Sequence, residues 1–228
     1  MLPLSDRAEA GRLLAAKLPE NLAKSDVVVI ALPRGGVSVA AEIAKHLRAP
    51  LDVVVVRKVG VPWEPELAMG AVASDGVTKL DHGLIRSLGL SNYFVYALVA
   101  KEEIQVRERE HLFRNGHPAV PISGRTILLV DDGAATGSTM LAATAALRKK
   151  NPKEIIVAVP VASRGAQASI EDEIGKFVCL SAPEPFVAVG QWYRSFPQIS
   201  DEEVQRLLSR SRLRKPDREF AVASAAAQ

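Results

Sequence analysis

The sequence predicts an α/β fold built on a parallel β-sheet with helices on both of its faces. The first observation is a set of apolar, largely β-branched runs without polar alternation, a pattern typical of strands covered on both sides. These runs occupy residues 27–32, 53–56, 126–130, 154–162 and 176–180. The second is that helix-period segments separate the runs, and strands that alternate with helices favour a parallel sheet.

The segments around these strands can be assigned in turn. An amphipathic helix opens the chain, with Asp6 as its cap and Glu9 three residues later. Helices are predicted near 37–47, 138–149 and 167–174, a hairpin within 67–81, and a long charged helix over 91–114. A loop rich in Gly and Pro is expected over 59–66. A last helix begins at Ser200, where Glu203 completes a capping box.

The chain length of 228 residues suits one large α/β domain. We predict a single domain over residues 1–205 and a basic tail over 206–228. Within the domain we expect a core at 26–180, a helical insertion at 82–117, and a small hood at 181–199 together with the N-terminal helix. The tail holds six Lys/Arg and two Asp/Glu, which gives it a charge of +4. Since the net charge of the whole chain is +3, residues 1–205 carry a net charge of −1. We interpret the tail as a solvated helix end, with contact to a polyanion as the alternative, and nucleic acid is not an expected partner.

Cysteine usage and hydropathy indicate the compartment. Cys179 is the single cysteine and lies in an apolar run, which excludes an internal disulfide framework and favours a buried strand thiol. No apolar run approaches the ~20 residues needed to span a bilayer, and residues 1–22 lack the pattern of a signal peptide. We therefore expect a soluble, cytoplasmic protein with no membrane partner.

The loop after the third predicted strand has the composition of an anion site. The strand ends in two acids, Asp131 and Asp132, and a small-residue turn leads into a helix. Small residues let backbone N–H groups point inward, and the helix N-terminus provides a field that favours an anion. Thr136, Ser138 and Thr139 add hydroxyl donors. The segment therefore predicts a cradle for a phosphate.

The two acids indicate what the phosphate is attached to. Carboxylates would repel a bare phosphate, but they accept hydrogen bonds from vicinal sugar hydroxyls and can hold water on Mg²⁺. A Walker A loop would need Lys where Gly137 stands, and the spacing of a dinucleotide-binding loop is also missing. The residues thus favour a sugar phosphate over a nucleoside triphosphate or a dinucleotide.

This stretch resembles the phosphoribosyl pyrophosphate signature of the type I phosphoribosyltransferases. The shared pattern is four apolar residues, two acids and a small-residue loop that ends in Thr-Gly-x-Thr, as in residues 127–139. The resemblance implies that Asp131 and Asp132 contact the ribose hydroxyls and the shell of a Mg²⁺ that the ligand brings. It also implies a 5-phosphate site made by residues Ala134, Ala135, Thr136, Gly137, Ser138 and Thr139.

Two further segments agree with this family. Pro33-Arg34-Gly35-Gly36 follows the first strand and is similar to the family's pyrophosphate loop, which implies a non-proline cis peptide bond, expected between Arg34 and Gly35. Arg57 and Lys58 are similar to the family's basic pair at the same pyrophosphate and are expected to end the second strand at the same edge of the sheet. Taken alone, the first segment could be a plain turn and the second a solvated strand end.

The resemblance implies an enzyme, a glycosyltransferase of the pentosyltransferase type in nucleotide metabolism. It would bind phosphoribosyl pyrophosphate with Mg²⁺ and transfer the phosphoribosyl group to a nitrogenous acceptor. Relatives that use 6-oxopurines place a third Asp where this chain has Ala135, so a base other than a 6-oxopurine is expected. Glu66 is then the candidate general base, within a 59–70 loop that could close over the site together with Trp63. Family members are commonly dimers, so the resemblance also implies a homodimer.

The acceptor site and the class of protein leave alternatives open. Phe186, Trp192, Tyr193 and Phe196 cluster in a chain with only 5% aromatic residues, and they either stack on the acceptor or fill core; the first three are the candidates for the acceptor. A non-catalytic sensor of phosphoribosyl pyrophosphate on the same fold is the alternative function. A hydrolase finds no support, because the serines lack a nucleophile-elbow pattern.

Overall fold

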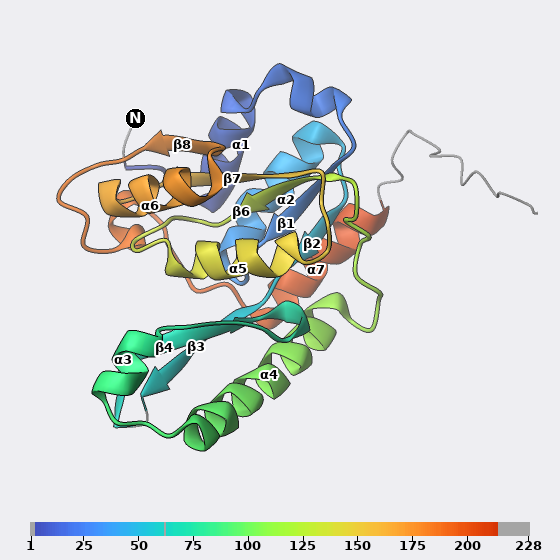
Figure 1. The fold of residues 1–228 in the computed structure, drawn as a ribbon. Coiled ribbons are helices and arrows are strands. Elements are labelled where there is room, and N and C mark those ends of the chain that lie inside the picture. Colours follow the sequence, from blue (N-terminus) through green and yellow to red (C-terminus); the bar gives the residue numbers. More distant parts are fainter. Residues whose placement is uncertain (1–2, 62, 214–228) are drawn as a thin grey trace, which may run out of the picture.

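A computed structural model describes residues 3–61 and 63–213, and the side chains of residues 65, 66 and 75 lie outside the description. A five-stranded parallel sheet in the order β2-β1-β6-β7-β8 forms the centre of the molecule (Figure 1). Its strands are β1 (Val27–Ala31), β2 (Leu51–Val53), β6 (Thr126–Val130), β7 (Glu154–Val161) and β8 (Phe177–Ser181). The predicted class, a parallel sheet flanked by helices, is confirmed.

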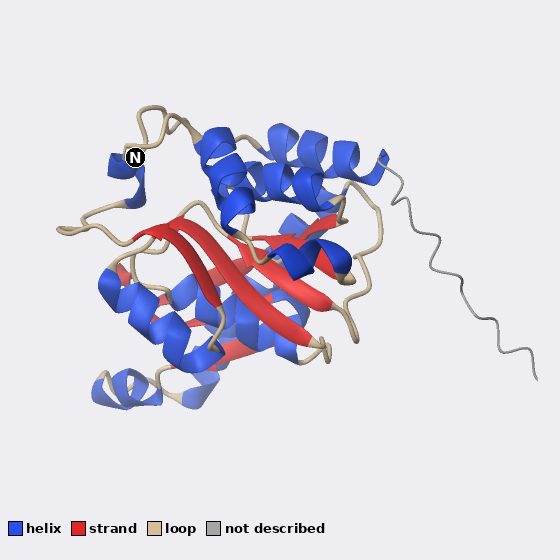
Figure 2. Cartoon of the chain, turned by 90° about the horizontal axis from the view of Figure 1, so that it is seen from above, coloured by secondary structure: helices blue, strands red, loops and turns tan. Residues whose placement is uncertain are grey.

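Helices cover both faces of this sheet, as Figure 2 shows from above. They are α1 (Arg7–Lys17), α2 (Gly35–Leu47), α5 (Ser138–Arg148), α6 (Arg164–Ile174) and α7 (Asp201–Leu213), with short 3₁₀ turns η1 (Glu20–Lys24) and η3 (Val189–Trp192). Val27 and Val29 pack into the same core cluster as residues of α1, α2 and α7. Val28 and Ile30 instead join the cluster that contains residues of α5 and α6. Because each face has its own apolar layer, the strands read as unbroken apolar runs.

A second, antiparallel sheet lies beside this core and packs on the long helix α4 (Figure 1). It consists of β3 (Val56–Val61), β4 (Glu64–Ala73) and β5 (Val77–Leu80), with the 3₁₀ turn η2 (Ser74–Gly76) between the last two. The helices α3 (His82–Ser87) and α4 (Asn92–Arg114) follow. The hairpin and the long helix are thus present as expected, and α3 is an addition.

The prediction of one strand over residues 53–56 is wrong. Ala31 pairs with Val53 as the last register of β2 in the parallel sheet. Val54 N still donates to Ala31 O (3.1 Å), but Val55 N donates to Ser74 Oγ (3.1 Å) in the turn η2, which connects β4 and β5 of the antiparallel sheet. The chain therefore changes sheets within one valine run, and all of Val53, Val54 and Val55 are buried, which hides the break in the sequence pattern.

The expected loop over residues 59–66 is wrong as well. These residues belong mostly to β3 and β4, which pair antiparallel from Val56↔Ala73 to Val61↔Glu64. Val59 and Val61 are buried in the cluster that includes Val95 and Val99 of α4. Helix α4 thus supplies the apolar partner that stabilises these strands, and nothing in the local Gly/Pro composition signals that partner.

The last helix begins where expected, with Ser200 Oγ accepting from Glu203 N (3.2 Å). It continues to Leu213, into the segment that the sequence analysis assigned to the basic tail, and it buries Val204 and Leu208. Residues 214–228 of that tail lie outside the described residues. Among the helices that are described, none has the length and apolar character needed to cross a bilayer.

A buried ion pair joins the insertion to the core. Asp52 is almost fully buried and accepts from Arg114 Nε (2.9 Å) and from Val120 N (2.8 Å), while Arg114 Nη2 donates to Val53 O (2.8 Å). The end of α4 and the strand β2 are thereby tied together where the chain leaves and re-enters the core.

Replacing Arg114 by Met should lower the free energy of unfolding by about 3–5 kcal/mol, because it leaves the Asp52 carboxylate buried without its partner. Urea unfolding followed by circular dichroism measures this change. The matched control is Arg148→Met, which removes a more exposed pair with Glu173 and should cost about 1 kcal/mol or less. Equal effects of the two substitutions would contradict the role assigned to the buried pair.

Candidate functional site

Two loops meet at the carboxyl edge of the parallel sheet. Strands β1 and β6 are parallel neighbours, with Ala31 paired to Val130, and Leu32 N donates to Val130 O (2.9 Å). The segment Pro33–Gly36 follows β1, and Asp131 and Asp132 follow β6. The sequence analysis expected both loops at this edge, and the structure brings them into contact.

The two glycines of the first loop pack directly on the two acids. A Cβ atom added to Gly36 would lie 2.9 Å from Asp131 Oδ1 and 2.9 Å from Asp131 Cα. A Cβ atom added to Gly35 would overlap Asp132 Oδ2. Since real Cβ atoms do not approach so closely, glycine is required at both positions.

The two carboxyl groups differ in their surroundings. Asp132 N donates to Asp131 Oδ1 (2.8 Å), so the first acid holds the backbone of the second. Burial, and then the charge of Asp132, raise the pKa of Asp131 well above its usual range. Asp132 faces a cation instead, because Arg7 Nε lies 2.7 Å from its Oδ2. No group of three or more His, Cys, Asp or Glu that could hold a metal ion occurs among the described residues.

Arg7, Tyr193 and Phe196 complete the surroundings of Asp132, and of these three the sequence analysis missed Arg7. Arg7 is buried, its Nη1 donates to Pro197 O (2.7 Å), and its guanidinium lies 3.6 Å from the centre of the Phe196 ring. Tyr193 Oη donates to Asp132 O (2.6 Å), and burial, followed by the charge of Asp132, raises the pKa of this phenol. Arg7 stands seven residues before Leu14, on the apolar side of its helix, and a charged residue there was the available signal.

The small-residue loop is held by hydrogen bonds to neighbouring segments and exposes two of its hydroxyl side chains. Ala134 N donates to Val161 O (2.9 Å), and Ser163 Oγ donates to Ala135 O (2.7 Å). Gly137 takes the left-handed conformation (φ 76°) that starts α5. The side chains of Thr136 and Ser138 are exposed and lie 3.2 Å apart at their hydroxyl oxygens.

The residues of this loop differ in exposure, and exposure decides which of them could contact an anion. The first turn of α5 contains backbone N–H groups that have no acceptor within the helix. Ala135, Thr136 and Ser138 are exposed, Thr139 is half-buried, and Ala134 and Gly137 are buried. Ala134 N–H is already used by Val161, so Ala134 shapes the loop, whereas the next residues can face a ligand.

The cis peptide bond expected between Arg34 and Gly35 lies one bond earlier, between Pro33 and Arg34. Arg34 already has helical dihedral angles (φ −95°, ψ −39°), because α2 begins at Gly35, and the Arg34–Gly35 bond belongs to the helix entry. The Arg34 guanidinium lies 3.5 Å from Asp201 Oδ1, and Arg109 Nη1 lies 2.7 Å from Asp201 Oδ2. Asp201, the first residue of α7, thus pairs with Arg34 of the glycine loop and with Arg109 of α4.

Arg57 and Lys58 do not end a strand of the parallel sheet, so that expectation is wrong. They lie in β3, where neighbouring side chains point to opposite faces. Arg57 lies on the α4 side, and its Nε donates to Glu102 Oε2. Lys58 is exposed on the same face as Val56, which packs near Ala146 of α5. The side chain of Glu66, the candidate base, lies outside the described part of the structure.

Three of the aromatic residues, Phe186, Trp192 and Tyr193, pack with Leu4 and Ala10 of the N-terminal segment. The rings of Phe186 and Trp192 are 6.0 Å apart, and those of Tyr193 and Phe196 are 5.0 Å apart. Trp192 Nε1 is buried without a hydrogen-bond partner among the described residues. Of the three aromatic residues predicted for the acceptor, Tyr193 is the one in contact with the acid pair.

A parallel α/β sheet with a glycine loop, an acid pair and a small-residue loop at the carboxyl ends of its strands has the arrangement that α/β proteins typically use to bind phosphate-containing ligands. The model of the phosphoribosyl transferase domain matches residues 4–192. This chain belongs to that family, and its fold is that of the type I phosphoribosyltransferases.

Relatives agree with this membership. Two curated proteins of Mycobacterium tuberculosis, from strains CDC 1551 and H37Rv, are each described as a "Putative phosphoribosyl transferase". Each is 44% identical over 220 residues, which cover 96% of this chain and 48% of the relative. The chain thus spans about half the length of the curated relatives it matches.

Two crystal structures are also similar. A protein from Thermus thermophilus is 40% identical with a TM-score of 0.77, covering 90% of this chain and 97% of that one. A hypothetical protein from Neisseria gonorrhoeae, with bound ppGpp, is 18% identical with a TM-score of 0.50 over 90% of this chain and 92% of that one. The second likeness is one of fold alone.

Replacing Gly35 by Ala should lower the free energy of unfolding by about 1–3 kcal/mol, because the new methyl group must push Asp132 away from Arg7. Chemical denaturation measures the loss. Gly165→Ala is the matched control, since its Cβ atom would meet nothing closer than Ser163 Oγ at 3.9 Å and should leave stability unchanged or slightly higher. If both variants were as stable as the wild type, the close packing of the glycine loop on the acids would be wrong.

Proposed function

We propose that this domain binds phosphoribosyl pyrophosphate together with Mg²⁺ and transfers the phosphoribosyl group to a nitrogenous acceptor. The observation that supports this most is the packing of the glycine loop on Asp131 and Asp132 beside an open phosphate-type loop. A ligand that bridges these parts must present hydroxyl groups to the acids and phosphates on either side of them. Phosphoribosyl pyrophosphate has these groups in that order.

The 5-phosphate is assigned to residues 135–139, where Thr136 and Ser138 present exposed hydroxyls at the start of α5. The ribose hydroxyls donate to the carboxylates of Asp131 and Asp132. Each hydrogen bond to a charged group contributes about 1.5–3 kcal/mol, so a few of them can hold the sugar phosphate at about micromolar strength.

The residues present fit Mg²⁺ as an ion that the ligand brings. The acid pair offers hard oxygen donors, and a cation beside it would offset the burial and the Asp132 charge that raise the pKa of Asp131. The described residues contain no third acid or histidine that would close a metal cage, so Asp131 and Asp132 belong to the outer shell. When bound, the ion neutralises charge on the pyrophosphate.

The pyrophosphate is assigned to Arg34, Gly35 and the basic residues of β3. Of the basic pair, Lys58 is the better candidate for direct contact, because Arg57 is engaged with Glu102 on the α4 side. Arg34 lies at the glycine loop itself and shares Asp201 with Arg109. These cations stabilise the charge that grows on the leaving group.

In the proposed reaction, a nitrogen lone pair of the acceptor attacks the anomeric carbon as the bond from that carbon to the pyrophosphate oxygen breaks. The bonding electrons leave with pyrophosphate, and the acceptor nitrogen loses its proton to a base or to water. The transition state resembles an oxocarbenium ion, as in glycosyl transfer generally. Ala135 offers no carboxylate to the acceptor, so a base other than a 6-oxopurine is proposed, and Glu66 stays the candidate base. The homodimer also stays a prediction.

Replacing both acids in Asp131→Asn/Asp132→Asn should weaken the binding of phosphoribosyl pyrophosphate at least 10-fold, because neutral amides cannot hold both the hydroxyls and the Mg²⁺ shell. Calorimetry in the presence of Mg²⁺ measures the affinity, and EDTA should weaken binding by the wild type. Asp172→Asn, an exposed carboxylate on α6, is the control and should bind normally. Equal affinity of the double variant and the wild type would remove the site assignment.

Turnover separates the transferase from the sensor that the sequence also allows. Incubation with phosphoribosyl pyrophosphate, Mg²⁺ and a panel of nitrogenous bases should release pyrophosphate with at least one base, and guanine and hypoxanthine should be poor acceptors because of Ala135. An enzyme-coupled pyrophosphate assay measures the release. Tight binding of phosphoribosyl pyrophosphate with no release for any base would support the sensor and overturn the enzyme.

A further inference from the structure

Two arginines from distant segments converge on one carboxylate beside the glycine loop. Arg34 Nη1 lies 3.5 Å from Asp201 Oδ1, and Arg109 Nη1 lies 2.7 Å from Asp201 Oδ2. Arg34 belongs to the loop after β1, Arg109 to α4, and Asp201 is the first residue of α7. A carboxylate flanked by two guanidinium groups stands where an anionic ligand of the same two arginines would bind.

The contacts of Asp201 are weak enough for an incoming anion to replace them. The side chains of Arg34 and Arg109 are 42% and 40% exposed, and ion pairs of such exposure contribute about 0–1 kcal/mol. Asp201 Oδ1 is buried and has no hydrogen-bond partner among the described residues, so its contact with Arg34 is an ion pair without a hydrogen bond. Pyrophosphate has more charge and more acceptor oxygens than one carboxylate, and it can therefore bind both arginines more strongly.

Helix α4 connects Arg109 with the other arginine that is assigned to the pyrophosphate. Arg57 Nε donates to Glu102 Oε2 of α4, and Arg109 follows Glu102 by seven residues. Residues seven apart lie on one face of a helix, two turns and about 10 Å from each other. The same face of α4 therefore meets Arg57 through Glu102 and Arg34 through the shared Asp201, so Arg109 belongs to the same group of cations.

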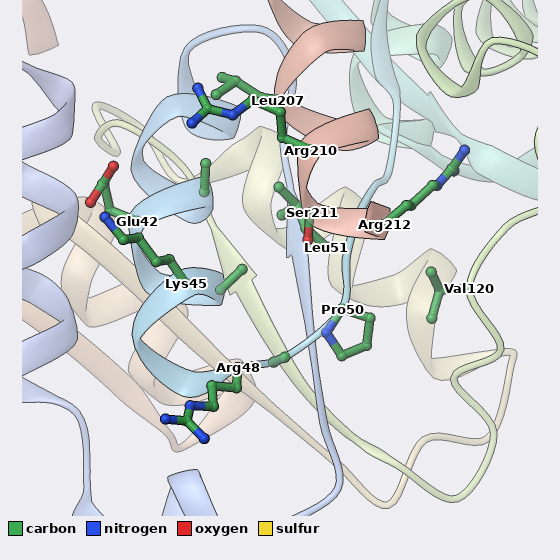
Figure 3. A pocket seen from close by; sticks show the side chains of 13 residues that line it. Glu42, Lys45, Arg48, Pro50, Leu51, Val120, Leu207, Arg210, Ser211 and Arg212 are labelled. Carbon is green, nitrogen blue, oxygen red and sulfur yellow. The ribbon is translucent and has the colours of Figure 1, made fainter. Parts of the chain in front are cut away.

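A groove between α2 and α7 also contains cations, but they do not converge. Lys45, Arg48 and Arg210 are among its lining residues. Figure 3 shows that their charged ends point in different directions. The groove therefore offers no common point for a compact anion, and we assign no ligand to it. Arg210 serves instead as a control for the arginines that meet at Asp201.

We propose that Arg109 is a further pyrophosphate-binding residue of the candidate site, and that Asp201 is an internal competitor of the pyrophosphate for Arg34 and Arg109. When the ligand binds, its pyrophosphate oxygens replace the Asp201 carboxylate. Arg34 then binds them from the glycine loop and Arg109 from α4. The choice of pyrophosphate as the anion rests on the proposed function, whereas the competition between Asp201 and an anion does not.

The first test removes Arg109. Calorimetry with Mg²⁺ measures the affinity of the full chain for inorganic pyrophosphate, ribose 5-phosphate and phosphoribosyl pyrophosphate. Arg109→Met should weaken the binding of both pyrophosphate-containing ligands at least 10-fold and change that of ribose 5-phosphate less than twofold. Arg107→Met on the same helix and Arg210→Met on α7 remove equal charge from exposed positions and should leave all three affinities within twofold. Because the Arg109 guanidinium also lies 5.9 Å from the Phe113 ring, thermal unfolding verifies that the variant folds.

The second test removes the competitor, and its expected sign is opposite. Asp201→Asn keeps the size of the side chain but releases both arginines, so it should strengthen pyrophosphate binding at least threefold. Glu202→Gln, at the next and exposed position of α7, makes the same change in net charge and should have a smaller effect. In the Arg109→Met background the gain from Asp201→Asn should shrink, because one of the two released arginines is missing. A purely structural ion pair would give no gain in affinity.

Several results would overturn the proposal. They are an equal loss for all three ligands in Arg109→Met, an equal loss in its controls, an unchanged or lower affinity in Asp201→Asn, and the absence of pyrophosphate binding by the wild type. The proposed function fails separately. If the wild type bound pyrophosphate with the expected changes in the variants but bound neither ribose 5-phosphate nor phosphoribosyl pyrophosphate, the transferase assignment would be wrong while the competition by Asp201 was supported.

Discussion

The candidate site depends on the close approach of one backbone loop to two carboxyl groups. Gly35 and Gly36 lie where any side chain would collide with Asp132 and Asp131. This approach follows from the sheet, because β1 and β6 are parallel neighbours and their loops leave from the same edge. Arg7 then reaches Asp132 from the N-terminal helix, so three segments far apart in the sequence are assembled around one acid. The phosphate-type loop follows on the same strand, where bonds to Val161 O and from Ser163 Oγ hold Ala134 and Ala135 in place.

The local sequence pattern was sufficient to predict the strands that are buried on both faces of the sheet. The strands β1 and β6 are buried along their whole length, so they appear as unbroken apolar runs in the sequence. The glycines, acids and hydroxyl residues that follow directly after these runs are therefore easily recognised. The parallel order could then be inferred from the alternation with helices. The acid pair and the loop after it were identified in this way because their chemistry is contiguous in the chain.

The remainder depended on contacts that leave little trace in the sequence. The valine run from residue 53 to residue 56 belongs to two sheets, and only the pairing partners, Ala31 for Val53 and Ala73 for Val56, reveal the change. Arg57 and Lys58 were therefore placed at the wrong edge. Asp201 is about 170 residues from Arg34 in the sequence, and no local periodicity could connect them. Arg7 could have been predicted from the sequence, since it interrupts the apolar side of an amphipathic helix.

The cations around the site share one property that bears on how an anion could enter. Arg7, Arg34 and Arg57 each face a carboxylate from a distant element, namely Asp132, Asp201 and Glu102. The Arg34 and Arg57 side chains are about two-fifths exposed, at 42% and 40%, and pairs of this kind contribute about 0–1 kcal/mol. A phosphate group can therefore compete for these two arginines at little cost. Arg7 is different, because it is buried and also binds Pro197 O and the Phe196 ring, so breaking its pair would leave a buried charge uncompensated. Arg7 therefore supports Asp132 in a fixed position, whereas the proposed pyrophosphate ligands Arg34 and, after release from Glu102, Arg57 could exchange their carboxylate partners for an anion.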